Sequence, residues 1–574
     1  METGGSMATT AGSAAAAKDP VAGAAALPLK LILVALCMAQ FINAYDTTAM
    51  NVAVTSVVKS LGTTVSGVQS ALVLYSLVMA SFMLIGGKLG DVWGRRTTFT
   101  LGISMYGVGA LITAFSLGLP MMIFGWSLLE GLGSALMIPA IFAIVGTIYP
   151  AGKPRVSAFA AVGAMAAMGA ALGPLICGFL TTYLTWRVSF LLEVCVVLAT
   201  LALSTRIKVP KQPRPQARLD YLGAFLSALG LALVVLGVLQ ASKYGWTAAR
   251  VPMLGWGKTL IPQGGISPVI PFVIVGVVVL LLFALWERHL LRAGKDALLN
   301  IGMLKNRAVL FGLLAIIAFM FMQAGFLFVG PVFMQMALGY TAFHSGLLIL
   351  PMTIMIIIVA TRVSKLTQIV APKLIVQIGM LVFVAGILLV AMELKATAQQ
   401  WVFLPGMIVS GIGIGLINAP LMNITQGAVP AKEQSEISGL SRAMSNLGGA
   451  FGTAVAGAVL MSTLIATFSG AVQQFNGIPA SEKPHVIVFL RHDAQTVSNA
   501  QITAWLKSKH EPAPLVQKFV QFNQDARNKG LQNALFAIGV LGLFGFVMSC
   551  FLPGGKTKKP AAEPDANAPP SPAT

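Results

Sequence analysis

The chain has 574 residues, of which 56% are hydrophobic and only 10% are charged, and its formal net charge is +20. Soluble domains usually carry about 25% charged residues, so this composition excludes an ordinary water-soluble fold and indicates an integral membrane protein. The basic residues collect in short loops between apolar runs and form no stripe with aromatic residues, so we expect no nucleic-acid partner.

Apolar runs recur along the chain at about the ~20 residues that a helix needs to cross the hydrocarbon core of a bilayer. Backbone N–H and C=O groups inside lipid need internal partners, so these runs predict helices. Membrane β-barrels, whose strands alternate polar and apolar residues, do not fit. We therefore predict an all-α integral membrane protein whose spans have the limits 29–54, 67–86, 97–116, 120–149, 157–180, 188–205, 219–241, 268–287, 308–331, 344–362, 373–394, 401–424, 437–467 and 531–552.

Topology follows from the loops that are rich in Lys and Arg. Loops 86–96, 206–218, 288–307 and 362–373 all fall on one side of the predicted arrangement, together with both termini. Cytoplasmic loops carry the excess of basic residues, so we expect a multi-pass protein of the cell inner membrane with both termini in the cytoplasm. Loop 468–530 is basic and lies on the other side, but long loops follow this rule weakly.

The order of the spans suggests six, then two, then six. The predicted units are a disordered cytoplasmic N-tail (1–28), an N-terminal six-helix bundle (29–205), a basic linker with two extra helices (206–287), a C-terminal six-helix bundle (288–552) that includes an extracytoplasmic loop (468–530), and a disordered cytoplasmic C-tail (553–574).

The loop after the second span combines glycines with charges of both signs. Asp91 and the arginines can form charge-assisted pairs between neighbouring helix ends, and the glycines permit a tight turn. We interpret this cluster as a cytoplasmic gate, and the alternative is an ordinary basic loop. Its candidate residues are Gly87, Asp91, Gly94, Arg95 and Arg96.

The fifth span contains a run of small residues around one proline. Small residues allow close helix packing in lipid, and Pro174 is expected to kink the helix. Generic packing is the alternative to a specific functional motif. The candidate residues are Gly169, Gly173, Pro174 and Gly178.

Three acidic residues interrupt apolar runs: Asp46 in span 1, Glu130 in span 4 and Glu193 in span 6. Carboxyl groups inside a membrane are costly and are functional candidates by default. We predict that these three residues take up and release protons. The alternative for Asp46 is a structural anchor or an interfacial position, and Glu193 is expected about one turn from the outer surface, where water would reach it.

These segments resemble known families. Residues 87–96 resemble the signature loop of the major facilitator superfamily, with Trp93 in place of its usual basic residue, and residues 169–178 resemble its antiporter motif, with Cys177 replacing a glycine. Residues 46–54 are similar to a pattern of the fourteen-helix drug:proton antiporter family. The resemblance implies a major facilitator fold, with two six-helix bundles and two additional central helices, and proton-driven drug export.

Span 4 departs from the family pattern. Ser127 stands where that family has an arginine linked to proton handling, and Glu130 stands at its glutamine position. This departure puts the usual coupling scheme in doubt, and Glu130 would then compensate as an extra protonatable group.

The sequence indicates the residues of a substrate cavity less clearly. Soft Met and aromatic side chains suit varied apolar or cationic ligands, although lipid-facing packing is the alternative. The candidate cavity residues are Met322, Gln323, Phe326 and Asn418.

The sequence thus predicts a monomeric exporter of small amphipathic molecules that works in membrane lipid by alternating access in exchange for protons. A dedicated metabolite, lipid or siderophore exporter is the alternative, followed by a receptor or scaffold that transports nothing. We expect no enzyme activity, since the sequence has no catalytic constellation and no phosphate-binding loop, and no cofactor. We expect no metal, because the spacing of His485, His492 and His510 fits no standard site.

Overall fold

The computed structural model describes residues 29–150, 153–204, 220–249, 251–255, 258–295, 297–336, 339–393, 400–430, 434–474, 503 and 513–554. Within these ranges, 14 helices are long and apolar enough to cross a membrane, which confirms the predicted number of spans. The basic linker 206–218, the three histidines between 485 and 510, and nearly all of both predicted tails lie outside the described residues.

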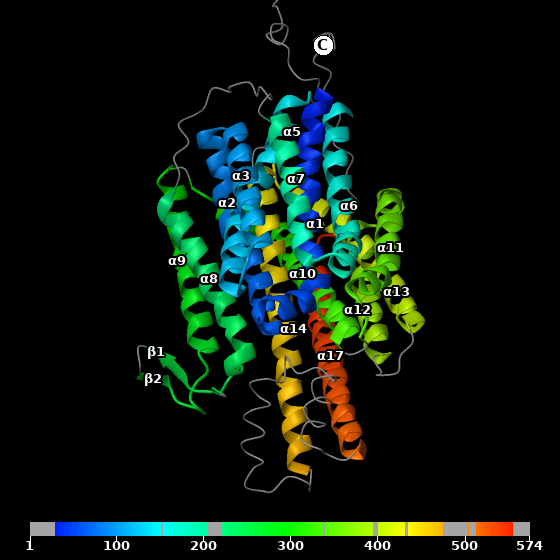
Figure 1. Cartoon of the computed structure of the whole chain (residues 1–574). Helices are drawn as coiled ribbons and strands as arrows, with labels where there is room; N and C mark the ends of the chain where they lie inside the picture. Colours follow the sequence, from blue (N-terminus) through cyan, green and yellow to red (C-terminus); the bar gives the residue numbers. More distant parts are fainter. Residues whose placement is uncertain are drawn as a thin grey trace, which may run out of the picture.

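The N-terminal bundle contains six spans (Figure 1). Its fourth span changes helix type partway along, because a π-helical segment, η1, separates a first α-helical turn from the rest. Wider π-helical turns occur often at functional sites. The elements are α1 (Leu29–Leu61), α2 (Val65–Trp93), α3 (Arg95–Ala114), α4 (Leu119–Met122), η1 (Ile123–Glu130), α5 (Gly131–Ile148), α6 (Lys153–Tyr183) and α7 (Trp186–Ser204).

The C-terminal bundle contributes another six spans beside it. Its elements are η2 (Ile301–Lys305), α10 (Arg307–Met336), α11 (Ala342–Ile369), α12 (Pro372–Met392), η3 (Gln400–Phe403), α13 (Leu404–Gln426), α14 (Gln434–Gln474) and α17 (Ala513–Cys550). The two bundles meet where α1, α2 and α6 pack against α10, α14 and α11.

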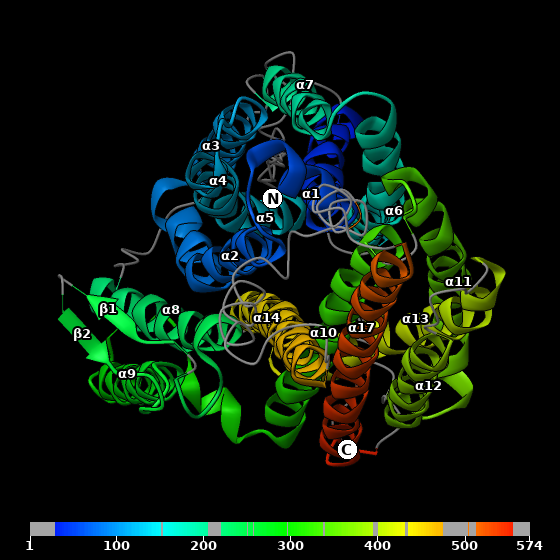
Figure 2. The ribbon, with the colours of Figure 1, turned by 60° about the horizontal axis from the view of Figure 1, so that its bottom comes forward.

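The two extra helices, α8 (Tyr221–Tyr244) and α9 (Val269–Arg292), are central in the sequence but peripheral in space. Figure 2 shows the pair at one edge of the molecule, where α8 packs against α2 and α14. An antiparallel hairpin of β1 (Met253–Gly255) and β2 (Lys258–Ile261) lies between them in the chain. The pair therefore covers one side of the bundle interface.

Helices α14 and α17 are longer than predicted, with 41 and 38 residues. At 1.5 Å per residue each reaches about 60 Å, roughly twice the hydrocarbon thickness, and their ends project together beyond the other helices at the bottom of Figure 1. The predicted loop 468–530 was therefore too long, since α14 continues to Gln474 and α17 begins at Ala513. Polar residues interrupt the apolar run there, but the mutual packing of the two helices maintains helical structure.

Candidate functional site

Three acidic side chains from different helices meet inside the N-terminal bundle. Asp46 lies near the middle of α1, Glu130 is the last residue of η1, and Glu193 lies in α7. A carboxyl oxygen from each lies within 4.8 Å of the other two. Their side chains are 0%, 0% and 1% exposed, respectively. The structure thus brings the three sequence-predicted acids together, and the expected hydration of Glu193 near the surface is wrong.

Asp46 is held by an indole. The Nε1–H of Trp126 donates to both carboxyl oxygens of Asp46, at 2.9 and 3.1 Å. Trp126 belongs to η1, and its ring stacks on Tyr75 with centroids 5.3 Å apart. The π-helical segment therefore supplies both Glu130 and the hydrogen-bond donor of Asp46.

The other two acids also accept hydrogen bonds from neutral donors. Tyr106 donates its hydroxyl to Glu193 Oε2 at 2.9 Å, and Thr113 donates to Glu130 Oε1 at 3.4 Å. Glu130 Oε2 is buried and has no hydrogen-bond partner among the described residues. In the described part of the N-terminal bundle, these three acids are the buried charged side chains. No buried basic side chain in that part compensates them.

This arrangement limits the charge that the cluster can carry. Two unit charges at 4.8 Å repel each other by about 3.5 kcal/mol at an effective dielectric constant of ~20. Three fully ionised carboxylates sealed from water would accumulate three such repulsions. Such a cluster is suited to taking up and releasing protons, and three carboxyl oxygens could also ligate a cation.

Ser127 stands where the family that span 4 resembles has arginine, and its hydroxyl group bonds to the backbone of α2. Its Oγ donates to the backbone oxygen of Ala71 at 2.8 Å, and the side chain is 1% exposed. Sequence reasoning missed Trp126 and Tyr106. The available signal was their polar atom within an apolar run, because a buried Trp N–H or Tyr O–H usually has a partner.

The predicted gate forms the corner between α2 and α3. Gly94 is the single residue between the two helices and has φ of 97°, a conformation that favours glycine. Arg95 donates to the backbone oxygen of Ala143 at 2.9 Å and to Thr147 Oγ1, both on α5. Asp91 is exposed. The gate residues that follow Gly94 are Arg95 and Arg96, both half-buried, whereas Gly87 faces Pro139 of α5.

The small residues of α6 connect the two bundles. A Cβ atom on Gly169 would meet the backbone oxygen of Phe41, and one on Gly173 would lie 2.8 Å from that of Tyr45, so both glycines allow α1 to approach closely. Further along α6, a Cβ on Gly178 would lie 2.7 Å from Ala342 O of α11. Pro174 O lies against Gly346, also in α11. Helix α6 therefore touches both the helix that carries Asp46 and the opposite bundle.

Two of the predicted cavity residues pack within the C-terminal bundle. Phe326 contacts the Phe383 ring edge-on at 6.1 Å, and Met322 Sδ occupies the space beside Gly542 of α17. Both side chains are buried, because this face of α10 meets α12 and α17, and their assignment to a cavity stays a prediction. Gln323 is half-buried and Asn418 is exposed.

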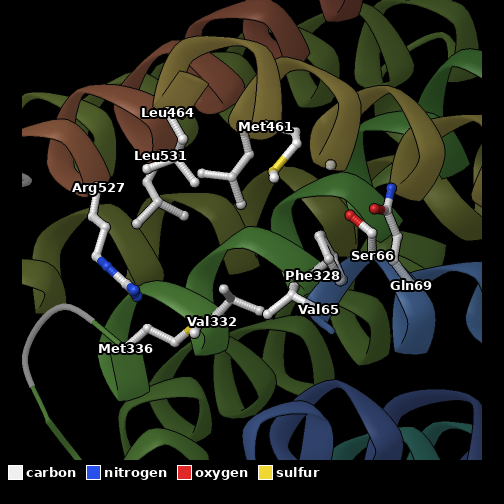
Figure 3. Close-up of a pocket in the computed structure, with 12 residues that line it drawn as sticks. Val65, Ser66, Gln69, Phe328, Val332, Met336, Met461, Leu464, Arg527 and Leu531 are labelled. Carbon is white, nitrogen blue, oxygen red and sulfur yellow. The ribbon is translucent and has the colours of Figure 1, made fainter. Parts of the chain in front are cut away.

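A pocket lies instead between α2, α10, α14 and α17 (Figure 3). On α10 its lining residues are Phe328, Val332 and Met336, a different face of that helix from the one predicted.

Comparisons with known proteins agree with this architecture. The family model described as Major Facilitator Superfamily matches residues 36–453. Cephamycin export protein CmcT of Amycolatopsis lactamdurans is 29% identical over 426 residues, covering 74% of this chain and 83% of that protein. Multidrug resistance protein Stp of Mycobacterium tuberculosis (strain CDC 1551 / Oshkosh) is 24% identical over 458 residues, covering 80% of each. The crystal structure of an auto-inhibited POT family peptide transporter matches with a TM-score of 0.57 and 14% identity, over 91% of this chain and 95% of that one, a likeness of fold alone.

Proposed function

Because this chain belongs to the major facilitator superfamily, we propose that it exports small amphipathic, drug-like molecules in exchange for protons. Members of this family are transporters and not enzymes. The export and multidrug-resistance names of the relatives support the direction and the cargo. The observation that carries the proton coupling is the sealed cluster of Asp46, Glu130 and Glu193.

In the proposed cycle the carboxyl cluster takes up protons from the outer side and releases them to the cytoplasm. Mutual repulsion means that the sealed cluster retains protons while the bundles change orientation. Loss of protons on the cytoplasmic side prepares the transporter for cargo, and protonation on the outer side displaces the cargo. Each proton that crosses 100 mV contributes about 2.3 kcal/mol, and each pH unit adds about 1.36 kcal/mol.

Helix α6 offers a route from the cluster to the bundle interface. Gly169 and Gly173 hold α6 against α1 on both sides of the Asp46 level, and Gly178 holds it against α11. A shift of α1 on protonation would displace packed backbone at these contacts, since none of them leaves room for a Cβ atom. We propose that this chain of contacts couples proton binding to the rocking of the bundles.

We further propose that both termini lie in the cytoplasm, that the protein resides in the cell inner membrane, and that it works as a monomer in lipid. Positive charge in the predicted loops supports this orientation. A dedicated metabolite, lipid or siderophore exporter would share the same cluster, and a substrate panel separates these possibilities.

The test is accumulation of a fluorescent cationic dye and of a neutral dye in inverted vesicles, whose outer face is the cytoplasmic one, with and without a proton ionophore. We expect ionophore to abolish wild-type transport, and Asp46→Asn, Glu130→Gln and Glu193→Gln to lower it strongly. Glu287→Gln is the matched control, because Glu287 is a fully buried acid of α9 outside the cluster. Proton-driven efflux that persists in all three cluster variants would contradict the proposal.

A further inference from the structure

Each bundle extends one glutamine side chain into hydrogen bonds with the other. Gln69 of α2 donates from Nε2 to the backbone oxygens of Thr453 and Ala454 on α14, at 2.7 and 3.2 Å. Gln335 of α10 donates from Nε2 to the backbone oxygen of Val52 on α1, at 2.8 Å. The two amides therefore tie two separate pairs of helices together across the bundle interface, one from each side.

Both glutamines lie toward the end of the bundles that faces away from the start of α1. Gln69 is the fifth residue of α2, which follows directly after the far end of α1 at Leu61. Gln335 is the last residue but one of α10, which begins at Arg307 on the opposite side. In the orientation proposed above, this is the outer end of the transporter.

The amide group of Gln69 is packed directly over a glycine. A Cβ atom on Gly457 of α14 would overlap this amide, whose atoms are the three nearest to that position. The side chain of Gln69 is 1% exposed. A buried amide that loses its hydrogen-bond partners is costly, so α2 and α14 can separate here only when water replaces the backbone oxygens of α14.

Gln335 holds α1 through both polar atoms of its amide. Besides the bond from Nε2 to the Val52 oxygen, Gln335 Oε1 accepts a hydrogen bond from the hydroxyl group of Thr55. Val52 follows Asp46 by six residues on the same helix, which is about 9 Å at 1.5 Å per residue. A shift of α1 on protonation of Asp46 would therefore displace the partners of Gln335.

We propose that Gln69 and Gln335 form the outer gate of this protein. Their bonds hold the outer ends of the bundles together, and exchange of these bonds for bonds to water opens the interface to the outside. Such an exchange between neutral groups has a small net cost, which allows repeated opening and closing. Both are positioning residues. The outward direction and the link to Asp46 rest on the proposed function, whereas closure of this end by the two amides does not.

The gate is tested by double electron–electron resonance on the full-length protein in nanodiscs, in a background whose four native cysteines are replaced by alanine. Spin labels at Leu117→Cys and Trp401→Cys report the outer ends, because both positions are exposed and each bundle provides one. We expect Gln69→Leu and Gln335→Leu each to raise the ratio of separated to closed outer ends about fivefold, the change that corresponds to one hydrogen bond.

A second pair of labels distinguishes a gate from general loosening. Leu29→Cys and Ile369→Cys are exposed at the cytoplasmic ends of α1 and α11. Because alternating access opens one side as the other closes, the two glutamine variants should decrease separation at this pair while they increase it at the outer pair. A merely structural role predicts wider distances at both ends.

Gln532→Leu is the matched control. Gln532 Nε2 donates to the backbone oxygen of Ala391 at 3.2 Å, a bond of the same type that joins α17 to α12 within one bundle. Its loss should leave the outer distances unchanged.

Glycine variants test the Gln69 contact without removing the amide. Gly457→Ala should reproduce the effect of Gln69→Leu, because the added methyl group displaces the end of a flexible side chain. Gly449→Ala in the same helix should not, since its Cβ would make an ordinary contact at 3.7 Å with Ala324. This pair keeps the test valid if Gln69→Leu fails to fold.

Unchanged outer distances in the folded Gln69→Leu and Gln335→Leu variants would overturn the proposal, as would separation at both ends or equal opening by Gln532→Leu. Dye transport tests the proposed function separately. Unchanged distances with intact proton-driven transport remove only the gate, whereas opening of the outer ends in a protein without proton-driven transport removes only the proposed function.

Discussion

The indole nitrogen of Trp126 donates to both carboxyl oxygens of Asp46, and this contact joins η1 to the middle of α1. The same short π-helical segment ends at Glu130, whose carboxyl group faces Asp46 and Glu193 within 4.8 Å. Any movement of α1 relative to the fourth span therefore changes the hydrogen bonding and the mutual repulsion of the acids together.

Trp126→Phe should lower proton-driven efflux about tenfold or more. The phenyl ring retains stacking on Tyr75, but Asp46 loses a donor at a fully buried position, and hydrogen bonds to charged groups contribute about 1.5–3 kcal/mol. Trp186→Phe is the matched control, because Trp186 is equally buried and its Nε1 has no hydrogen-bond partner among the described residues. Equal losses in the two variants would point to ring packing instead of the hydrogen bond.

Glu130→Gln should reduce efflux without lowering the thermal unfolding temperature. The neutral amide removes one source of repulsion in the cluster. Glu130 Oε2 has no hydrogen-bond partner among the described residues, so the substitution breaks no such bond at this atom. A structural anchor would behave differently, since its loss would lower both quantities. Thermal unfolding in detergent, followed by tryptophan fluorescence, alongside dye efflux distinguishes the two roles.

Gly178→Ala should impair both stability and transport. A methyl group there would lie 2.7 Å from the backbone oxygen of Ala342, so α6 and α11 would have to separate. Gly163→Ala in the same helix is the control, because a Cβ at that position meets nothing within 4 Å. Alanine favours a helix by up to about 1 kcal/mol over glycine, so the control variant should be as stable as the wild type or more so. Similar unfolding temperatures for both variants would rule out a tight α6–α11 contact.

A double-mutant cycle on Arg95→Ala and Thr147→Val should give a coupling energy of about 1 kcal/mol, which is typical of a side-chain hydrogen bond. Arg95 contacts α5 through this hydroxyl and through the Ala143 carbonyl, so the single variants should also alter the transport rate. Strict additivity in unfolding experiments would mean that the two side chains do not interact in the membrane-embedded protein.

The spans could be predicted from sequence because lipid imposes a length of about 20 apolar residues on every crossing. The acids could be predicted one by one, since a carboxyl group in such a run is costly. The sequence could not predict that the three carboxyl groups lie side by side. Glu193 lies well inside α7, and Tyr106 and Glu130, which lie beside its carboxyl group, come from other helices.

The direction in which side chains face and the positions of the helix ends were harder to predict. Helix α10 is apolar on all sides, so periodicity does not indicate which side Met322 and Phe326 face. Arg527 was overlooked because Asp525, Arg527 and Lys529 together have the composition of a loop. Only the packing of α17 against α14 and α10 shows that this segment is helical and that Arg527 lies in a pocket.

Coupled proton movement is the most direct test of the account. Liposomes containing the purified protein and a trapped pH-sensitive dye are exposed to a gradient of a neutral transported dye, and proton flux is recorded beside substrate flux. We predict proton flux opposite to substrate flux in the wild type. A combined Asp46→Asn, Glu130→Gln and Glu193→Gln variant should show no coupled proton flux, while substrate still exchanges down its gradient. Undiminished proton flux in that variant would contradict the assignment of the carboxyl cluster.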